Sequence, residues 1–260
     1  MTQPATSSAS QIDQMREELA LANRLLHHWG LAVYEGHVSA RIPGTEQFLI
    51  KGKPQVSMDR VQPADLMIMD FDGNVVEASK DYPDPVSSWA MHAEIYRARP
   101  DVGSVAHTHQ KWCTIIGIAG KDVLPLQHAN SAVIAVRPWP VYDETFDNIT
   151  DKYQPKVVAR ALQDFPALHL RNHGMIFVGG NIEKAIIGAR NGEYQAELTW
   201  RSLLVGTPVV LPTIFMRDEI DRDLTPSIWE VRDGVSINEM NIHGWLDENR
   251  AAARDRKVRL

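Results

Sequence analysis

The sequence predicts a single α/β domain in which helices pack against a mixed β-sheet. Three observations support this fold class: helical stripes of apolar residues alternate with short strand-like runs, turn residues separate them, and no repeat or long linker divides the 260 residues. Hydrophobic residues make up 44% of the chain and charged residues 23%, so a sizeable core is expected.

The first half of the chain is expected to contain a long helix followed by strands. Apolar residues at spacings of three and four form one stripe that stops before Gly30: Ile12, Met15, Leu19, Ala22, Leu26 and Trp29. The period then becomes typical of strands, which we place at residues 38–42, 47–50 and 66–69, with a turn at residues 72–74.

The second half is expected to alternate between helices and strands. A helix should begin after Pro85 and end before Pro100, because proline is not tolerated inside a helix. The other expected helices start near residue 111 and span residues 154–165 and 182–204, and the other strands span residues 102–107, 168–170 and 175–178.

The expected organisation is a flexible N-terminal arm at residues 1–10, a single domain at residues 11–250 and a charged tail at residues 251–260. The first ten residues do not resemble a secretory signal, no stretch is apolar enough to span a membrane, and the single cysteine cannot form an internal disulfide. We therefore expect a cytoplasmic protein without a membrane partner. The net charge of −6 and the absence of a basic stripe argue against a nucleic-acid partner.

The most informative segment is the strand-like run that ends in His107-Thr108-His109. Side chains alternate along a strand, so His107 and His109 point the same way and could bind one metal ion. His173 lies in an Asn-His-Gly turn between two short strands and could be a third ligand. Spacing alone leaves open that these are ordinary packed or surface histidines, and Cys113 is interpreted as a buried structural thiol.

Several motifs, in order along the chain, resemble those of the class II aldolase and adducin family. They are Gly36-His37-Val38-Ser39-Ala40-Arg41, the segment from Pro85 to His92, Ile95 to Asp101 running into His107-Thr108-His109, and Asn172-His173-Gly174 followed by Gly179-Gly180 and a long helix. The resemblance covers roughly residues 12–205. It implies an αβα sandwich with a mixed, largely antiparallel sheet, and one divalent metal ion per subunit, zinc or manganese, on His107, His109 and His173. It also implies a homotetramer with active sites between subunits.

The chain departs from the sugar-phosphate aldolases of this family at three places. Ser88 stands where they resemble one another in a catalytic glutamate, Lys51-Gly52-Lys53 replaces a phosphate-binding loop of small residues, and His37 replaces an asparagine. A serine without an activating base cannot remove a substrate proton, whereas decarboxylation needs no such base. The electron pair left by carbon dioxide can delocalise onto an oxygen held by a Lewis-acidic metal.

These departures resemble the branch of the family that decarboxylates hydroxylated aromatic or heteroaromatic dicarboxylic acids. We therefore expect a small-molecule aromatic carboxylate as substrate, with the basic residues binding a carboxylate that stays on the product. His128 is the candidate proton donor, although it could equally cap a turn, and Ser88 is the second candidate catalytic residue. The candidate substrate-binding residues are His37, Arg41, Lys51 and Ser87.

Two alternatives stay open. An aldolase acting on a non-phosphorylated hydroxy-keto acid could use another group in place of the glutamate. A non-catalytic, adducin-like module is the other alternative, but such a module has no physical reason to keep all three candidate metal ligands.

Overall fold

The computed structural model describes residues 8–33, 35–53, 57–79, 81–127, 133–145, 149–150 and 152–211, with the backbone of a short strand pair, β10 (Val231–Arg232) and β11 (Val235–Ser236). The helices are α1 (Ala9–His28), α2 (Trp89–Ala98), α3 (Lys111–Ile118), α4 (Gln154–Leu162) and α5 (Ile182–Val205), with short 3-10 helices η1 (Met58–Arg60) and η2 (Pro63–Asp65). The strands of the main sheet are β1 (His37–Arg41), β2 (Gln47–Lys53), β3 (Leu66–Asp70), β4 (Val75–Glu77), β5 (Asp84–Pro85), β6 (Ser104–Thr108), β7 (Val141–Tyr142), β8 (Ala167–Leu170) and β9 (Gly174–Gly179).

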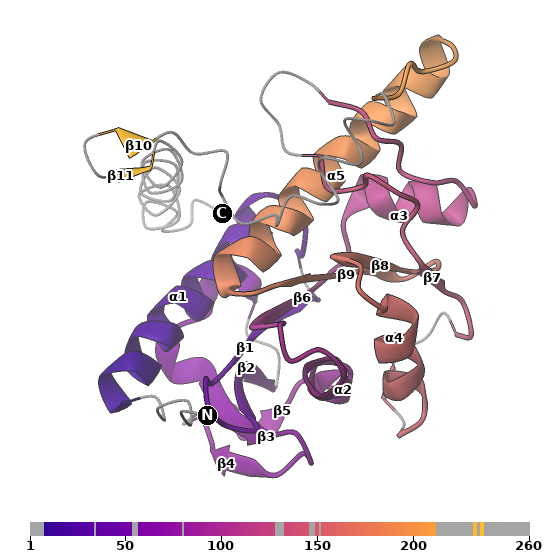
Figure 1. The fold of residues 1–260 in the computed structure, drawn as a ribbon. Coiled ribbons are helices and arrows are strands. Elements are labelled where there is room, and N and C mark those ends of the chain that lie inside the picture. Colours follow the sequence, from indigo (N-terminus) through magenta and orange to yellow (C-terminus); the bar gives the residue numbers. More distant parts are fainter. Residues whose placement is uncertain are drawn as a thin grey trace, which may run out of the picture.

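The main sheet is mixed and largely antiparallel, as predicted. Its strand order is β4-β3-β2-β1-β6-β9-β8-β7, with β5 pairing to β2 outside this path. Only the β7–β8 pair is parallel among these pairings. In Figure 1, α1 and α5 lie along one side of the sheet and α2 and α4 along the other, which gives the expected three layers.

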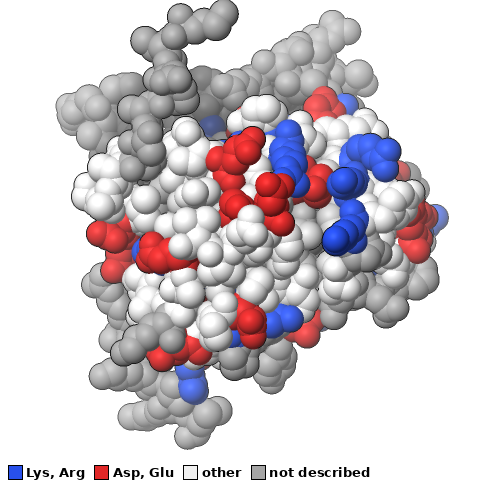
Figure 2. All heavy atoms as spheres, turned by 90° about the horizontal axis from the view of Figure 1, so that it is seen from below, with Lys and Arg blue, Asp and Glu red and all other residues white. Residues whose placement is uncertain are grey.

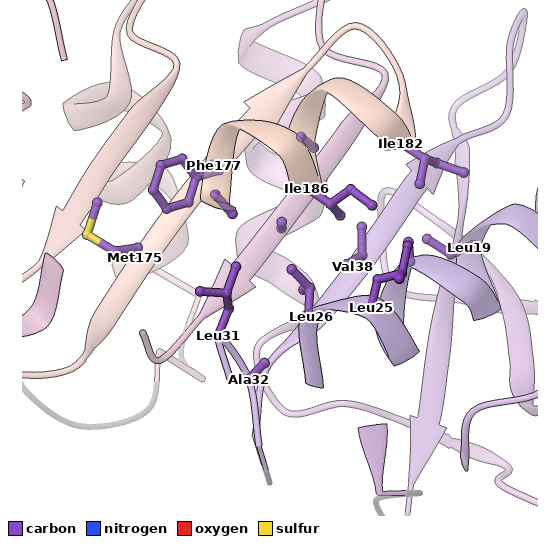
Figure 3. Close-up of a cluster of buried hydrophobic side chains, with 14 of the residues drawn as sticks. Leu19, Leu25, Leu26, Leu31, Ala32, Val38, Met175, Phe177, Ile182 and Ile186 are labelled. Carbon is purple, nitrogen blue, oxygen red and sulfur yellow. The ribbon is translucent and has the colours of Figure 1, made fainter. Parts of the chain in front are cut away.

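Each face of the sheet carries its own hydrophobic cluster. Alternation along the strands sends Val38 and Phe177 to the side of α1 and α5, where Leu25 and Ile186 pack against them (Figure 3). The opposite cluster includes Val105 and residues of α2 and α4, such as Ile95 and Val158. Each face of the sheet is therefore covered by a separate set of apolar side chains. Polar side chains on the strands are exceptions within these apolar layers.

Most predicted elements are found where the sequence places them, with small shifts at their ends. The helix predicted at residues 154–165 ends at Leu162, because Gln163 adopts a positive φ of 49°. The predicted ten-residue arm is too long: α1 begins at Ala9, where Ser8 and Gln11 form a capping box. Residues 1–7 and the tail predicted at 251–260 lie outside the described residues.

The surface seen in Figure 2 carries acidic and basic side chains close to one another, without a continuous basic area. Ion pairs among the described residues include Arg97 with Asp72 and Glu94, and Arg99 with Asp101. Of the helices in the described part of the chain, none has the length and hydropathy required to cross a bilayer.

Candidate metal centre and active site

Three histidines converge at one end of the central strands. His107 belongs to the end of β6, His109 follows that strand directly, and His173 lies in the turn between β8 and β9. One ring nitrogen from each lies within 4.8 Å of the others. The antiparallel pairing of β6 with β9, which places His107 opposite Ile176, brings His173 next to His107 and His109, which lie 66 and 64 positions earlier in the sequence.

The turn that carries His173 leaves no room for a larger residue after it. Asn172 has a positive φ of 57°, a conformation that asparagine tolerates better than most residues. A Cβ atom on Gly174 would lie 2.2 Å from the carbonyl oxygen of Thr108 and 2.7 Å from Cδ2 of His109. Glycine at position 174 therefore allows the two histidine-bearing segments to approach closely.

The ring nitrogens of the cluster fit a divalent metal ion. Nδ1 of His107 donates a hydrogen bond to the carbonyl oxygen of Met175 at 3.0 Å, so its Nε2 is the atom left to bind a metal. Nε2 of His107 lies 3.0 Å from Nε2 of His109, slightly closer than the roughly 3.4 Å between two nitrogens in a tetrahedral zinc site. Burial lowers the pKa of His107 well below its usual value and that of His109 to about 4, so both rings are neutral near pH 7.

His37 lies beside the histidine cluster on the neighbouring strand. It pairs with His107 in the β1–β6 register, and the two ring centroids are 5.3 Å apart. Gly36 precedes it with a φ of 115°, and a Cβ there would lie 2.9 Å from the carbonyl oxygen of His107. Burial lowers the pKa of His37 well below its usual value, and His92, His107 and Lys51 lower it further.

A buried hydrogen-bonded group lies behind His37. The hydroxyl oxygen of Ser39 lies 2.6 Å from both Nδ1 of His92 and the hydroxyl of Tyr96. Burial raises the pKa of Tyr96, so its phenol stays protonated and needs an acceptor. Tyr96 therefore donates to Ser39, and Ser39 donates to His92. Burial lowers the pKa of His92 to about 3, and its ring centroid is 4.7 Å from that of His37.

The candidate residues on β2 and before α2 lie at the same end of the sheet. The β1–β2 register pairs Ala40 with Leu49, so its continuation puts the end of β2 opposite His37. The ammonium of Lys53 donates to the hydroxyl of Ser87. Ser88 is buried at the N-cap position of α2, and its side chain makes no capping hydrogen bond. One helical turn separates Ser88 from His92, so both face the sheet from the same side of α2.

Lys51 and Arg41 do not form the single basic cluster that the sequence suggested. Lys51 is fully buried, its ammonium lies 3.2 Å from the sulfur of Met58, and its charge lowers the pKa of His37. The role of Lys51 in substrate binding stays a prediction. Arg41 lies at the opposite end of β1. Its guanidinium donates to the backbone carbonyl oxygens of Tyr96 and Arg99 at the C-terminal end of α2 and of Val102 in the segment that follows. Its role in substrate binding stays a prediction, while these three hydrogen bonds assign it a structural role at the end of the helix.

Sequence reasoning missed one acidic group near the histidines. Glu35 is exposed, and its charge raises the pKa of both His109 and Lys51, although burial lowers each of them more. The signal was its position directly before the Gly36-His37 motif. The predicted proton donor, His128, lies outside the described residues. Cys113 is buried and accepts a hydrogen bond from the side chain of Gln110.

Comparisons with known proteins agree with this architecture. The family described as "Class II Aldolase and Adducin N-terminal domain" matches residues 17–200. A 3,4-dihydroxyphthalate decarboxylase from Arthrobacter keyseri is 30% identical over 183 residues, which are 67% of this chain and 73% of that protein. A 5-deoxy-D-ribulose 1-phosphate aldolase from Bacillus thuringiensis serovar kurstaki is 28% identical over 202 residues, 77% of this chain and 91% of that protein.

Two solved structures share the fold. An L-fuculose 1-phosphate aldolase aligns with a TM-score of 0.70 and 24% identity, covering 84% of this chain and 97% of that one. An aldolase II superfamily protein from Pseudomonas syringae aligns with a TM-score of 0.77 and 22% identity, covering 95% of this chain and 96% of that one. At these identities the likeness concerns the fold alone.

Proposed function

The chain belongs to the class II aldolase and adducin family, and within it we propose a metal-dependent lyase that decarboxylates a hydroxylated aromatic or heteroaromatic dicarboxylic acid. One observation carries the proposal: a histidine cluster that fits a divalent metal is combined with Ser88 at the position where aldolases of this family resemble one another in a glutamate. The metal would be zinc, which imidazole ligands suit, or manganese.

Ser88 favours decarboxylation over aldol chemistry on chemical grounds. An aldol cleavage or condensation through an enediolate requires a base that removes a proton from carbon or oxygen. A serine hydroxyl does this only when a neighbouring base activates it. Loss of carbon dioxide leaves an electron pair without any prior deprotonation, so the reaction needs a site that accepts negative charge and a group that later supplies a proton.

The residues around the cluster provide for these needs. A divalent metal held by His107, His109 and His173 would act as a Lewis acid toward the negative charge that develops on the substrate. His37 would form the adjoining wall and orient the ring. Lys53 and Ser87, which are hydrogen-bonded to one another, would bind the carboxylate that stays on the product. The buried charge of Lys51 would raise the positive potential of this end of the sheet.

The relatives support both branches of the family without separating them. The dihydroxyphthalate decarboxylase carries the same type of reaction in its name, at 30% identity, and the 5-deoxyribulose phosphate aldolase follows at 28%. A homotetramer with active sites between subunits is part of the proposal, because the family resemblance implies it and the histidine cluster lies at an end of the sheet. His128 remains the proposed proton donor.

Glu35 favours a second candidate function. Its carboxylate is exposed and close enough to influence the pKa of His109. A carboxylate near the metal ligands could replace the absent glutamate as the base of an aldolase that acts on a non-phosphorylated hydroxy-keto acid. This second function predicts that the protein exchanges the α-protons of a keto acid with solvent deuterium and that Glu35→Gln removes the exchange.

The test compares three activities of one preparation. The protein is stripped of metal, reloaded with Zn²⁺ or Mn²⁺, and assayed for carbon dioxide release from a panel of hydroxy-aromatic mono- and dicarboxylic acids. The same samples are assayed for cleavage of fuculose 1-phosphate and for proton exchange of pyruvate in deuterium oxide. We expect metal-dependent carbon dioxide release from a dicarboxylate whose leaving carboxylate adjoins a hydroxyl group. A turnover of fuculose 1-phosphate near the enzyme median of roughly 10 per second, with no decarboxylation, would overturn the proposal.

A further inference from the structure

The segment that follows β6 and carries His109 is held by hydrogen bonds to neighbouring parts of the fold, including α5. The backbone N–H of His109 donates to the carbonyl oxygen of Leu31 at 2.9 Å. The side chain of Gln110 accepts from the hydroxyl of Thr108 at 2.8 Å and donates to the carbonyl oxygen of Ala189 on α5 at 3.2 Å. Gln110 is the N-cap residue of α3, but its side chain makes no capping bond. The cap of α3 therefore has to come from elsewhere.

Glu193 supplies this cap from α5. Its carboxylate accepts hydrogen bonds from the backbone N–H of Trp112 at 2.7 Å and of Cys113 at 3.0 Å. Each carboxylate oxygen accepts from one of these two N–H groups. Both N–H groups lie in the first turn of α3, where the helix itself provides no acceptor. Such caps normally come from Ser, Thr, Asp or Asn at the N-cap position, three residues away at most. Here the capping group is 80 residues away in sequence.

The charge of Glu193 is balanced mainly by the helix it caps. No ion pair recorded for the described residues includes Glu193. Burial raises the pKa of this carboxyl group, while the hydrogen bonds from Trp112 and Cys113 lower it. A buried carboxylate at a helix N-terminus is stabilised by the helix dipole, and the N-terminus is held to the carboxylate in turn.

We infer that Glu193 is a positioning residue that helps to fix His109 relative to His107 and His173. This inference rests on the proposed metal centre. Only two residues separate His109 from Trp112, so a shift of the first turn of α3 is transmitted directly to the imidazole. The opposite side of the imidazole offers no compensating space, because a Cβ on Gly174 would already lie 2.7 Å from its Cδ2 atom. A metal ion needs its three nitrogens placed together, so a displaced His109 weakens binding.

Cobalt binding by the metal-free, full-length protein tests the inference without reference to activity. The dissociation constant is measured by competition with a chromophoric chelator, and the visible absorption of bound Co²⁺ reports the ligand geometry. We expect Glu193→Ala to bind Co²⁺ about tenfold more weakly than the wild type and to show a changed absorption spectrum. Glu193→Gln should lose less, because its amide oxygen still accepts one of the two N–H bonds.

Glu197→Ala is the matched control. Glu197 lies one turn further along α5 and forms an ion pair with Arg201 on the surface, so its removal should leave both the affinity and the spectrum unchanged. A purely structural role for Glu193 would lower the melting temperature of the variant and leave the cobalt spectrum as in the wild type, which overturns the inference. If Glu193→Ala does not fold, the nearly isosteric Glu193→Gln decides by the same two measurements. A wild-type protein that binds no Co²⁺ would instead overturn the proposed metal centre.

Discussion

The two ends of β1 place polar side chains on the same face of the sheet, yet they differ in whether those side chains already have partners. At one end, the Arg41 guanidinium donates to three backbone carbonyl oxygens and lies over the rings of Phe71 and Tyr96. At the other end, Nδ1 of His37 and Nε2 of His92 are buried without a hydrogen-bond partner among the described residues. Buried polar groups are almost always paired, so the Arg41 end serves the fold. The unpaired groups at the His37 end lie next to the histidine cluster and support the proposal that this end binds a ligand.

The largest expected effect is the loss of metal binding when the histidine cluster near the His37 end of β1 is changed. Replacing His107, His109 or His173 with alanine should abolish stoichiometric metal binding and the proposed activity, because each removes one of three ligands. The proteins should remain folded, since the hydrophobic clusters lie elsewhere. Elemental analysis with circular dichroism checks both points, and His27→Ala on α1 is the control. Full metal occupancy in all three variants would show that the cluster is only packed histidine.

The second prediction concerns the opposite end. Arg41→Ala should lower the free energy of unfolding by about 3 kcal/mol, because it leaves carbonyl oxygens at the end of α2 without donors and removes ring contacts. Cobalt affinity should stay within about twofold of the wild type, since the residue is not near a ligand. Arg97→Ala is the control: this arginine forms surface ion pairs, whose loss costs less than about 1 kcal/mol. A large loss of metal affinity in Arg41→Ala, at unchanged stability, would show that the Arg41 end of β1 serves ligand binding and not the fold.

Arg41 also shows which residues of the candidate site could not be placed from the sequence. The histidine cluster was predictable from two sources. Strand alternation puts His107 and His109 on one side, and the resemblance to the family joined His173, in its Asn-His-Gly turn, to them. The role of Arg41 depends on which end of α2 meets which end of β1, and that is a matter of tertiary packing. A basic residue near other basic residues in sequence therefore gave a false impression of a common site.

The same limit explains what was missed in the fold. Long helices and buried strands were predictable from periodicity, and the described strands and helices follow them closely. The two-residue strands β5 and β7 carry no period at all, so only pairing with β2 and β8 defines them. Glu193 is the clearest case: within its helix it looks like any other glutamate, and its function depends on a helix that begins 82 residues earlier.

Replacing Lys51, near the His37 end, should change the free energy of unfolding by a smaller amount that depends on pH. Burial lowers the pKa of Lys51 to about 8, whereas in the unfolded chain it is about 10.4. Between these values the unfolded state binds more protons, so stability rises with pH across this window; below it, both states are protonated and the cost of burying the charge is complete. Lys51→Met should therefore raise the free energy of unfolding by about 2 kcal/mol at pH 7 and by much less near pH 10.

Chemical denaturation at the two pH values checks this prediction. Lys53→Met, two residues along the same strand and only partly buried, controls for loss of a positive charge. If the charge of Lys51 serves the site, the Lys51→Met protein should be more stable but less active. The buried charge would then lower the stability of the fold in exchange for activity. An equal gain in stability at pH 7 and pH 10 would show that packing alone, and not the charge, explains it.

Ser39 lies between His37 and Arg41 on β1. Its substitution therefore tests where the part of the strand that serves ligand binding ends and the part that serves the fold begins. Its hydroxyl accepts from Tyr96, whose carbonyl oxygen holds Arg41, and donates to His92, which lies against His37. Ser39→Ala should cost about 1–2 kcal/mol of stability, because it leaves a phenol donor and an imidazole acceptor buried without this partner. In a Tyr96→Phe background the same substitution should cost less, since only the bond to His92 is then lost, and denaturation of the four proteins in this cycle measures the difference.

Cobalt binding by Ser39→Ala then assigns the hydroxyl to one end or the other. His92 and His37 are not ligands of the cluster, and His107 is held by the carbonyl oxygen of Met175 and not by either of them. We therefore expect the affinity for Co²⁺ to fall by less than about threefold, below the tenfold or greater loss typical of groups bonded directly to a ligand. A tenfold loss would mean that the bonds from Tyr96 through Ser39 and His92 reach the metal ligands. The ligand-binding end of β1 would then extend to the middle of the strand, and only Arg41 would belong wholly to the fold.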